Sequence, residues 1–155
     1  MCNGQGVWDE IYLHLPPLWI RIFAMTDNPS LYELMGGEAG LRALVKRFYD
    51  IMDSAPETAK IRSLHLTSLD NAREKLFMFL SGWSGGPPLY MEKIGQPRLR
   101  LRHLPFLIGD QERNEWLWCM GKALDETSIP GETIEMLKER FGQIADNMRN
   151  RPIGL

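Results

Sequence analysis

Apolar side chains recur at spacings of three and four residues in four segments, and this pattern most constrains the fold. The segments cover residues 38–52, 69–83, 110–124 and 131–148. A helix with this spacing presents one apolar stripe to a core. Residues 98–102 alternate arginine and leucine, which taken alone indicates an edge strand, but the sequence offers no second strand to pair with it. The pattern therefore predicts an all-α domain with four substantial helices.

Local signals mark the ends of these helices. Gly36-Gly37 is expected to form the corner before the first helix, and residues 84–88 (Ser-Gly-Gly-Pro-Pro) to end the second. Ser54 and Glu57 have the spacing of a capping box, which predicts a short helix between the first two long ones. The last helix is expected to fray into Asn150.

Composition and charge restrict the class of protein. The 155 residues are 44% hydrophobic and 25% charged, which fits one globular domain. With 18 basic against 20 acidic side chains, the chain lacks the positive field that binds nucleic acid or anionic membranes. Two cysteines, Cys2 and Cys119, cannot form a disulfide framework or a cysteine zinc cluster, and no apolar run is long enough to span a membrane. We expect a cytoplasmic protein without nucleic-acid or membrane partners.

The first 25 residues differ from the rest of the chain. Met25 is followed by a polar stretch, and the regular helical pattern starts only after it. Two interpretations stay open: Met25 is the physiological start, or residues 1–24 form an amphipathic extension that packs on the domain. The expected organisation is an extension at 1–25, a domain at 26–150 and a tail at 151–155.

The helical faces carry many aromatic side chains, and one histidine follows a run of arginines. The aromatic residues are Phe48, Tyr49, Phe79, Trp83 and Trp116. His103 directly follows Arg98, Arg100 and Arg102 in the alternating run. Aromatic rings for a flat ligand, cations for its carboxylates and an imidazole for its iron are residue types that suit a haem site. The spacing alone leaves open that His103 is an ordinary loop histidine.

These residues lie in a series of motifs that resembles the truncated globins of group II. The motifs are Leu31-Tyr32-Glu33 with Gly36-Gly37, Phe48-Tyr49, Phe79-Leu80 with Gly85-Gly86-Pro87, the run from Pro97 to Phe106, and Glu112-Arg113 before Trp116 and Cys119-Met120. They occur in the right order over about residues 31–125. The resemblance implies a truncated globin fold, a two-over-two helical sandwich around haem b (iron protoporphyrin IX). It also replaces the strand at residues 98–102 by a loop and a brief helix.

The resemblance gives the central residues their roles. It implies that His103 is the proximal ligand of the haem iron, and that Tyr49 and Trp116 donate hydrogen bonds on the distal side. Such donors stabilise dioxygen, which becomes polarised on iron, more than carbon monoxide. Ala72 stands where many globins carry a distal histidine and cannot donate. His65 is a third distal candidate; it could also ligate the iron, cap the following helix or face water.

The remaining assignments form the walls and the rim of the pocket. The expected lining is Phe48, Ala72, Leu76, Phe79, Leu80, Trp83, Leu99, Phe106 and Ile108. Lys75 and Arg102 are expected to bind the haem propionates, which leaves Arg98 and Arg100 as surface charges.

The resulting hypothesis is a haem-binding globin that reversibly binds dioxygen, nitric oxide and carbon monoxide, as a monomer or homodimer. One alternative is a haem enzyme of the peroxidase or nitric-oxide dioxygenase type, with Tyr49, Trp116 and His65 as three donors. It would need an external reductase, since no flavin or nicotinamide domain is visible in the sequence. The other alternative is a haem-free helical module that binds an acidic partner through its arginine run. No catalytic residue is assigned.

Overall fold

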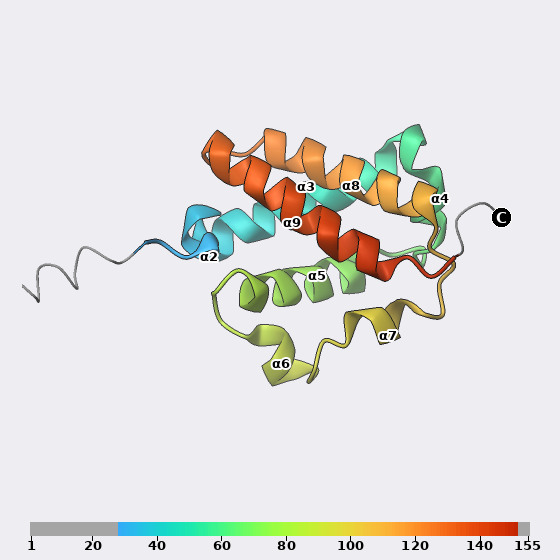
Figure 1. Cartoon of the computed structure of the whole chain (residues 1–155), viewed down its shortest axis with the longest axis horizontal. Helices are drawn as coiled ribbons and strands as arrows, with labels where there is room; N and C mark the ends of the chain where they lie inside the picture. Colours follow the sequence, from blue (N-terminus) through green and yellow to red (C-terminus); the bar gives the residue numbers. More distant parts are fainter. Residues whose placement is uncertain (1–27, 152–155) are drawn as a thin grey trace, which may run out of the picture.

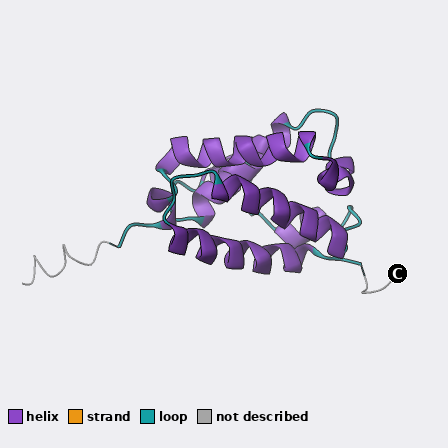
Figure 2. Cartoon of the chain, turned by 90° about the horizontal axis from the view of Figure 1, so that it is seen from above, coloured by secondary structure: helices purple, strands orange, loops and turns teal. Residues whose placement is uncertain are grey.

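The computed structural model describes residues 28–151, in which all regular structure is helical (Figures 1 and 2). The long helices are α3 (Gly37–Ser54), α5 (Asp70–Trp83), α8 (Asp110–Asp125) and α9 (Gly131–Met148). The short ones are α2 (Leu31–Leu34), η1 (Pro56–Thr58), α4 (Ala59–Ser63), α6 (Leu89–Lys93) and α7 (Leu99–His103). The all-α class is confirmed, and the alternating arginine run belongs to a helix. The expected extension at 1–25 and all but the first residue of the tail lie outside the described residues.

The long helices form two pairs, α3 with α5 and α8 with α9. Helix α3 also packs on α8 and so joins the pairs, which confirms the two-over-two sandwich. In Figure 1, α5 lies between α9 on one side and the segment that carries α6 and α7 on the other. Among the described elements, α5 and α7 are not a closely packed pair, whereas α7 packs against α9. No helix within residues 28–151 combines the length and apolarity needed to cross a membrane.

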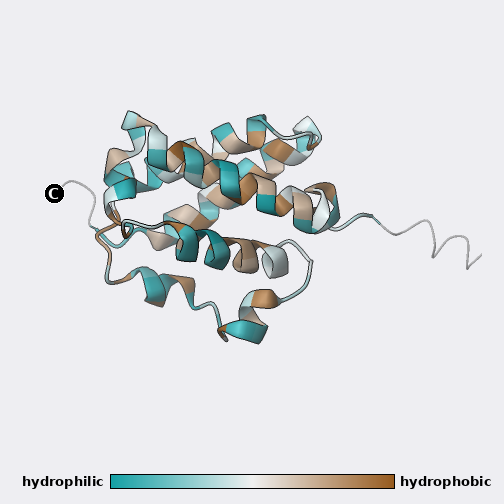
Figure 3. Ribbon diagram, turned by 180° about the vertical axis from the view of Figure 1, so that it is seen from behind, coloured by the Kyte–Doolittle hydropathy of each residue, from teal (hydrophilic) through white to brown (hydrophobic). Residues whose placement is uncertain are grey.

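The stripe predicted for residues 38–52 is the buried face of α3. Leu41, Leu44, Val45 and Phe48 are all at most 3% exposed, at the spacing of an amphipathic helix. Figure 3 shows brown and teal segments interleaved along the long helices, as one buried and one solvated side require. Burying each of these side chains contributes roughly 1.5–3 kcal/mol. The core between the two helix pairs is therefore apolar and continuous.

Helix α5 carries two apolar faces. Phe77, Met78 and Leu80 are buried in the core. A second stripe, Ala72, Leu76, Phe79 and Trp83, repeats at spacings of four, three and four and is only half-buried. Packing within the described residues therefore leaves part of the apolar surface of α5 uncovered.

The corner before α3 forms as expected, but the predicted capping box is wrong. Gly36 and Gly37 both adopt positive φ angles, 89° and 63°, which glycine tolerates without strain. Ser54 is the last residue of α3, and its hydroxyl donates to the carbonyl oxygen of Asp50 at 2.7 Å. A serine still inside a helix finds the free carbonyl of the preceding turn, so it cannot cap the next helix.

Candidate functional site

His103 ends α7, and one hydrogen bond fixes its ring. Its Nδ1 lies 2.7 Å from the carbonyl oxygen of Leu99. Because a carbonyl oxygen can only accept, Nδ1 is the donor, so in the neutral ring Nε2 carries the free lone pair. The imidazole is half-buried and in the tautomer that binds a metal through Nε2.

The segment after His103 is fixed by Asn150, which contradicts the expected fraying at that residue. The Nδ2 amide of Asn150 donates to the carbonyl oxygens of His103 at 3.1 Å and Phe106 at 2.7 Å. Its Oδ1 accepts the Ile108 backbone N–H at 3.0 Å. These bonds give Asn150 an ordered position past the end of α9, so the chain stays tied to the His103 segment.

The arginines of the run have different partners. Arg100, expected to be a surface charge, donates from Nη1 to the carbonyl oxygen of Asn147 at 2.7 Å and so caps the end of α9. Arg102 donates from Nε to the Pro97 carbonyl oxygen at 2.9 Å, which leaves its Nη groups for another acceptor. Arg98 begins the α7 segment with a φ of 41°.

Apolar side chains around His103 are exposed. Leu104 is 52% and Phe106 41% exposed, whereas Ile108 is buried. Leu99 is half-buried, and Lys75 on α5 is exposed. Exposed apolar residues clustered beside the His103 imidazole indicate a face that something else covers.

A second group of predicted residues meets around Phe48 of α3. The ring of Tyr49 packs edge-on against Phe48 at 4.8 Å and against His65 at 5.9 Å between centroids. Trp116 of α8 lies 5.2 Å from Phe48. Among the described residues, neither the Tyr49 hydroxyl nor the Trp116 indole N–H makes a hydrogen bond within the protein. Both donors are therefore free to bond to a partner from outside the protein, either solvent or a bound ligand.

The aromatic cluster continues across to α9 through Phe141. Trp83 stacks on Phe141 at 5.1 Å and 24°, and Phe141 meets Trp116 at 5.9 Å. The cluster thus links α3, α5, α8 and α9, and it brings together Phe48, Tyr49, Trp83 and Trp116 as expected. Phe141 is absent from the predicted lining because its spacing made it an ordinary core residue.

Protonation in the distal cluster follows from burial. Burial raises the pKa of Tyr49, and the nearby charge of Arg73 offsets only part of this, so the phenol remains a donor at neutral pH. Burial lowers the pKa of His65; the hydrogen bond to Ile61 opposes this by less, and the charge of Arg62 lowers the pKa further. His65 is therefore neutral at pH 7.

The neutral ring of His65 offers an acceptor rather than a donor. Its Nδ1 donates to the carbonyl oxygen of Ile61 at 2.9 Å, so Nε2 carries no proton. The alternative in which His65 caps α5 is excluded, because the ring bonds backwards to α4 and packs against Tyr49. The three-donor interpretation thus reduces to two donors, Tyr49 and Trp116, and one acceptor.

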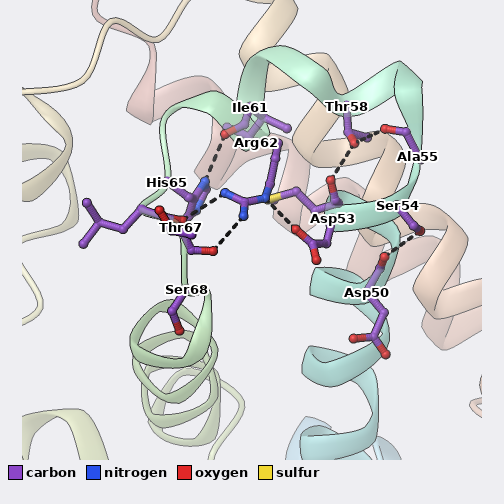
Figure 4. Close-up of polar contacts among 12 residues, drawn as sticks. Asp50, Asp53, Ser54, Ala55, Thr58, Ile61, Arg62, His65, Thr67 and Ser68 are labelled. Carbon is purple, nitrogen blue, oxygen red and sulfur yellow. Dashed lines mark hydrogen bonds and ion pairs between the residues drawn. The ribbon is translucent and has the colours of Figure 1, made fainter.

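A solvent-open groove of about 610 Å³ lies between the end of α3 and α4, with His65 in its wall. Figure 4 labels several of its lining residues, among them Asp53, Arg62 and Thr67. Met52, Arg62, His65 and Thr67 contribute to its wall. Of the residues predicted for the pocket, His65 alone lines this groove, so it is a separate feature of the surface.

Comparison with known proteins identifies the family. Residues 30–150 match the sequence model of the bacterial-like globins. The group 2 truncated hemoglobin YjbI of Bacillus subtilis (strain 168) is 38% identical over 120 residues, which are 77% of this chain and 88% of that protein. The chain belongs to the group II truncated globins.

Two solved structures of truncated globins share its fold. The cold-adapted truncated hemoglobin of the Antarctic marine bacterium Pseudoalteromonas haloplanktis TAC125 is 44% identical, with a TM-score of 0.78 over 80% of this chain and all of that one. The truncated oxygen-avid haemoglobin of Bacillus subtilis is 38% identical, with a TM-score of 0.71 over 79% of this chain and all of that one. The likeness to each structure covers about four fifths of this truncated globin.

Globins bind haem, and the side chains of this truncated globin fit that group. The haem iron needs an imidazole with a free nitrogen, and His103 has one. The flat porphyrin ring needs apolar side chains that cover its two faces. The half-buried stripe of α5 and the exposed apolar residues after α7 supply that surface on two helices that do not pack closely together. The donor set and the uncovered surface therefore agree with the family.

Proposed function

We propose that this truncated globin binds haem b through Nε2 of His103 and reversibly binds dioxygen, with nitric oxide and carbon monoxide as further ligands. The observation that carries the proposal is the His103–Leu99 hydrogen bond, because it makes Nδ1 the donor and leaves Nε2 of the neutral ring free to bind iron. Haem supplies an iron with one open position for a diatomic gas. The oxygen-avid relative from Bacillus subtilis supports dioxygen as a ligand.

Apolar side chains on two sides and cations at the rim would hold the haem. Leu76 and Phe79 of α5 would cover its distal face, and Leu99, Phe106 and Ile108 would pack on the face of His103. Lys75 and the Nη groups of Arg102 bind the propionates, since both side chains are exposed cations on the helices that flank the ring.

The distal side of the pocket selects polar ligands. The Tyr49 hydroxyl and the Trp116 indole donate to the ligand, and each is a donor without a protein acceptor among the described residues. The ring of His65 packs edge-on against the ring of Tyr49, with centroids 5.9 Å apart, and so limits where the Tyr49 side chain can lie. Two donors in a low-dielectric pocket retain dioxygen, which draws negative charge, more than carbon monoxide.

Absorption spectra of the oxidised, dithionite-reduced and carbon-monoxide-bound protein test the proposal. A His103→Gly variant, with and without added imidazole, is the matched comparison. We expect a five-coordinate ferrous spectrum that disappears in the variant and returns when imidazole fills the space left by the side chain.

Two outcomes would overturn parts of the proposal. A purified protein that takes up no haem, even when haem is added, would reject the cofactor. A haem spectrum unaffected by His103→Gly would reject His103 as the ligand while leaving the cofactor in place.

A further inference from the structure

Glu115 of α8 is a buried carboxylate that makes two hydrogen bonds. The residue is 9% exposed. Its Oε2 accepts the backbone N–H of Ile61 at 2.8 Å, and its Oε1 accepts the side-chain amide of Gln111 at 2.9 Å. Glu115 takes part in no ion pair within residues 28–151. Burying a charge against neutral donors alone is costly, so the contact with α4 needs an explanation.

The backbone of α4 depends on that contact. Ile61 is the third residue of α4, and the first backbone N–H groups of a helix have no partner inside it. Thr58 stands at the N-cap position, but its hydroxyl donates to the carbonyl oxygens of Met52 and Ala55 and caps nothing. Helix α4 has five residues and is too short to be stable alone. Glu115 therefore acts as a cap supplied by another helix.

The same residue of α4 also holds the ring of His65. The carbonyl oxygen of Ile61 accepts the Nδ1 proton of His65, as the dashed line in Figure 4 shows. Glu115 bonds to the amide of Ile61 and His65 bonds to its carbonyl. A displacement of Ile61 thus moves the acceptor that sets the tautomer of His65.

Arg62 anchors the far end of the segment. Its guanidinium donates to Asp53 Oδ1 at 2.7 Å and to the carbonyl oxygens of Leu66 at 3.0 Å and Thr67 at 2.9 Å (Figure 4). His65 lies between the Glu115 contact and these carbonyls. The segment is consequently fixed to α8 at its start and to α3 at its end.

We propose that Glu115 is a positioning residue for His65. By capping α4 from α8, its carboxylate holds the Ile61 carbonyl where it binds the Nδ1 proton, and Nε2 of His65 stays an acceptor beside Tyr49. This inference rests on the proposed function for its effect on ligand binding, but the link from Glu115 to His65 belongs to the protein alone.

The haem-free protein tests the link directly. Glu115→Leu removes both acceptors at similar volume, Glu115→Gln keeps one acceptor oxygen, and Gln111→Leu removes the other partner of Glu115 without touching Ile61. We expect Glu115→Leu to speed amide exchange of Ile61 by about fivefold or more and to give a mixture of His65 tautomers by ¹⁵N NMR. Glu115→Gln should show a smaller change in the same direction, and Gln111→Leu no change in tautomer.

The haem-loaded protein tests the consequence. We expect Glu115→Leu to change the oxygen dissociation rate about threefold or more, and to change it by less than about 1.5-fold when His65 is already leucine. Equal effects in both backgrounds would mean that Glu115 acts through general stability, and would overturn the inference.

Other outcomes are also decisive. An unchanged His65 tautomer in Glu115→Leu would overturn the inference. If Glu115→Leu does not fold, the Glu115→Gln variant decides by whether Ile61 exchange and the oxygen rate shift together. A protein that binds no haem would reject the proposed function, while the NMR measurements would still test the link.

Discussion

His65 and His103 each make the same type of local hydrogen bond, but their surroundings differ. Each ring donates Nδ1–H to the carbonyl oxygen four residues earlier, Ile61 at 2.9 Å and Leu99 at 2.7 Å. His65 then packs against the buried ring of Tyr49, whereas His103 is followed by exposed apolar side chains. A short helix sets the tautomer of a histidine, and the surroundings decide what its second nitrogen meets.

The anchors of the two short helices also differ in chemistry. The segment after α7 is bound by the neutral amide of Asn150, whereas α4 is bound by charged side chains, Glu115 and Arg62. An amide that donates and accepts can satisfy three backbone groups at once. A carboxylate can only accept and a guanidinium can only donate. Glu115 therefore bonds to a backbone N–H of α4, Arg62 bonds to Asp53 and to carbonyl oxygens, and α4 needs both anchors.

Among variants of the two anchored segments, Asn150→Ala is expected to change the free energy of unfolding most. It removes three hydrogen bonds to backbone groups beside α7, although the His103 carbonyl keeps its bond to the Phe106 N–H, so the free energy of unfolding should fall by about 2–3 kcal/mol. Urea unfolding of the haem-free protein measures it. Asn147→Ala is the control, since that exposed side chain makes no bond within the described residues, and its effect should stay within about 0.5 kcal/mol. Similar losses in both variants would contradict the anchoring role.

Trp116→Phe is expected to act on the distal side alone. Loss of one donor to a charged ligand costs about 1.5–3 kcal/mol, so oxygen should dissociate roughly tenfold faster or more. Carbon monoxide release should change much less, because that ligand stays nearly neutral. Flash photolysis and stopped flow give both rates. Trp118→Phe, on the exposed side of the same helix, is the control; equal changes for both gases would mean that the indole acts by bulk.

Arg62→Lys should weaken the α4 side by a smaller amount. Lysine presents one ammonium in place of the guanidinium fork and cannot reach Asp53 and both carbonyls, so a loss of about 1 kcal/mol is expected in urea unfolding. Arg47→Lys, which alters an exposed pair with Glu126, should cost less than about 0.5 kcal/mol. A loss at Arg62 no larger than at Arg47 would show that the α4 segment does not depend on this anchor.

The smallest effect concerns pH. Burial lowers the pKa of His65 in the folded protein. Between that lowered pKa and about 6.5, the unfolded chain binds a proton that the folded chain does not. The free energy of unfolding therefore falls as pH decreases through this window, and the full loss is present below the lowered pKa. Urea unfolding of the haem-free protein at about pH 7.5 and 5.5 should show a weaker decrease in His65→Gln than in the unchanged protein. An identical decrease would contradict the burial of the ring.

The long helices were predictable from sequence, but the anchors of the short ones were not. The spacing of Leu41, Leu44 and Phe48 is visible in the sequence and predicts a helix, and four such stripes predict the all-α class. Asn150 and Glu115 bond to backbone groups that are distant in sequence, so no spacing announces them. The polar residues around Asn150 instead indicated the frayed end of a helix.

Protonation in the site was equally hidden from the sequence. His65 was expected among the donors, but the carbonyl of Ile61 takes its proton and leaves an acceptor. The half-buried second stripe of α5 could be predicted as apolar, whereas its exposure depends on how far α7 lies from α5. Sequence therefore names the residue types of the site, and tertiary contacts decide their chemical state.

Glu115 and Trp116 are consecutive residues of one rigid helix, and this adjacency has a mechanical consequence. One carries the cap of α4 and the other the indole of the aromatic cluster. If α8 slides or tilts as a rigid body, for example during thermal expansion, the indole and the α4 segment are carried along together. The spacing between Trp116 and His65 is thereby conserved.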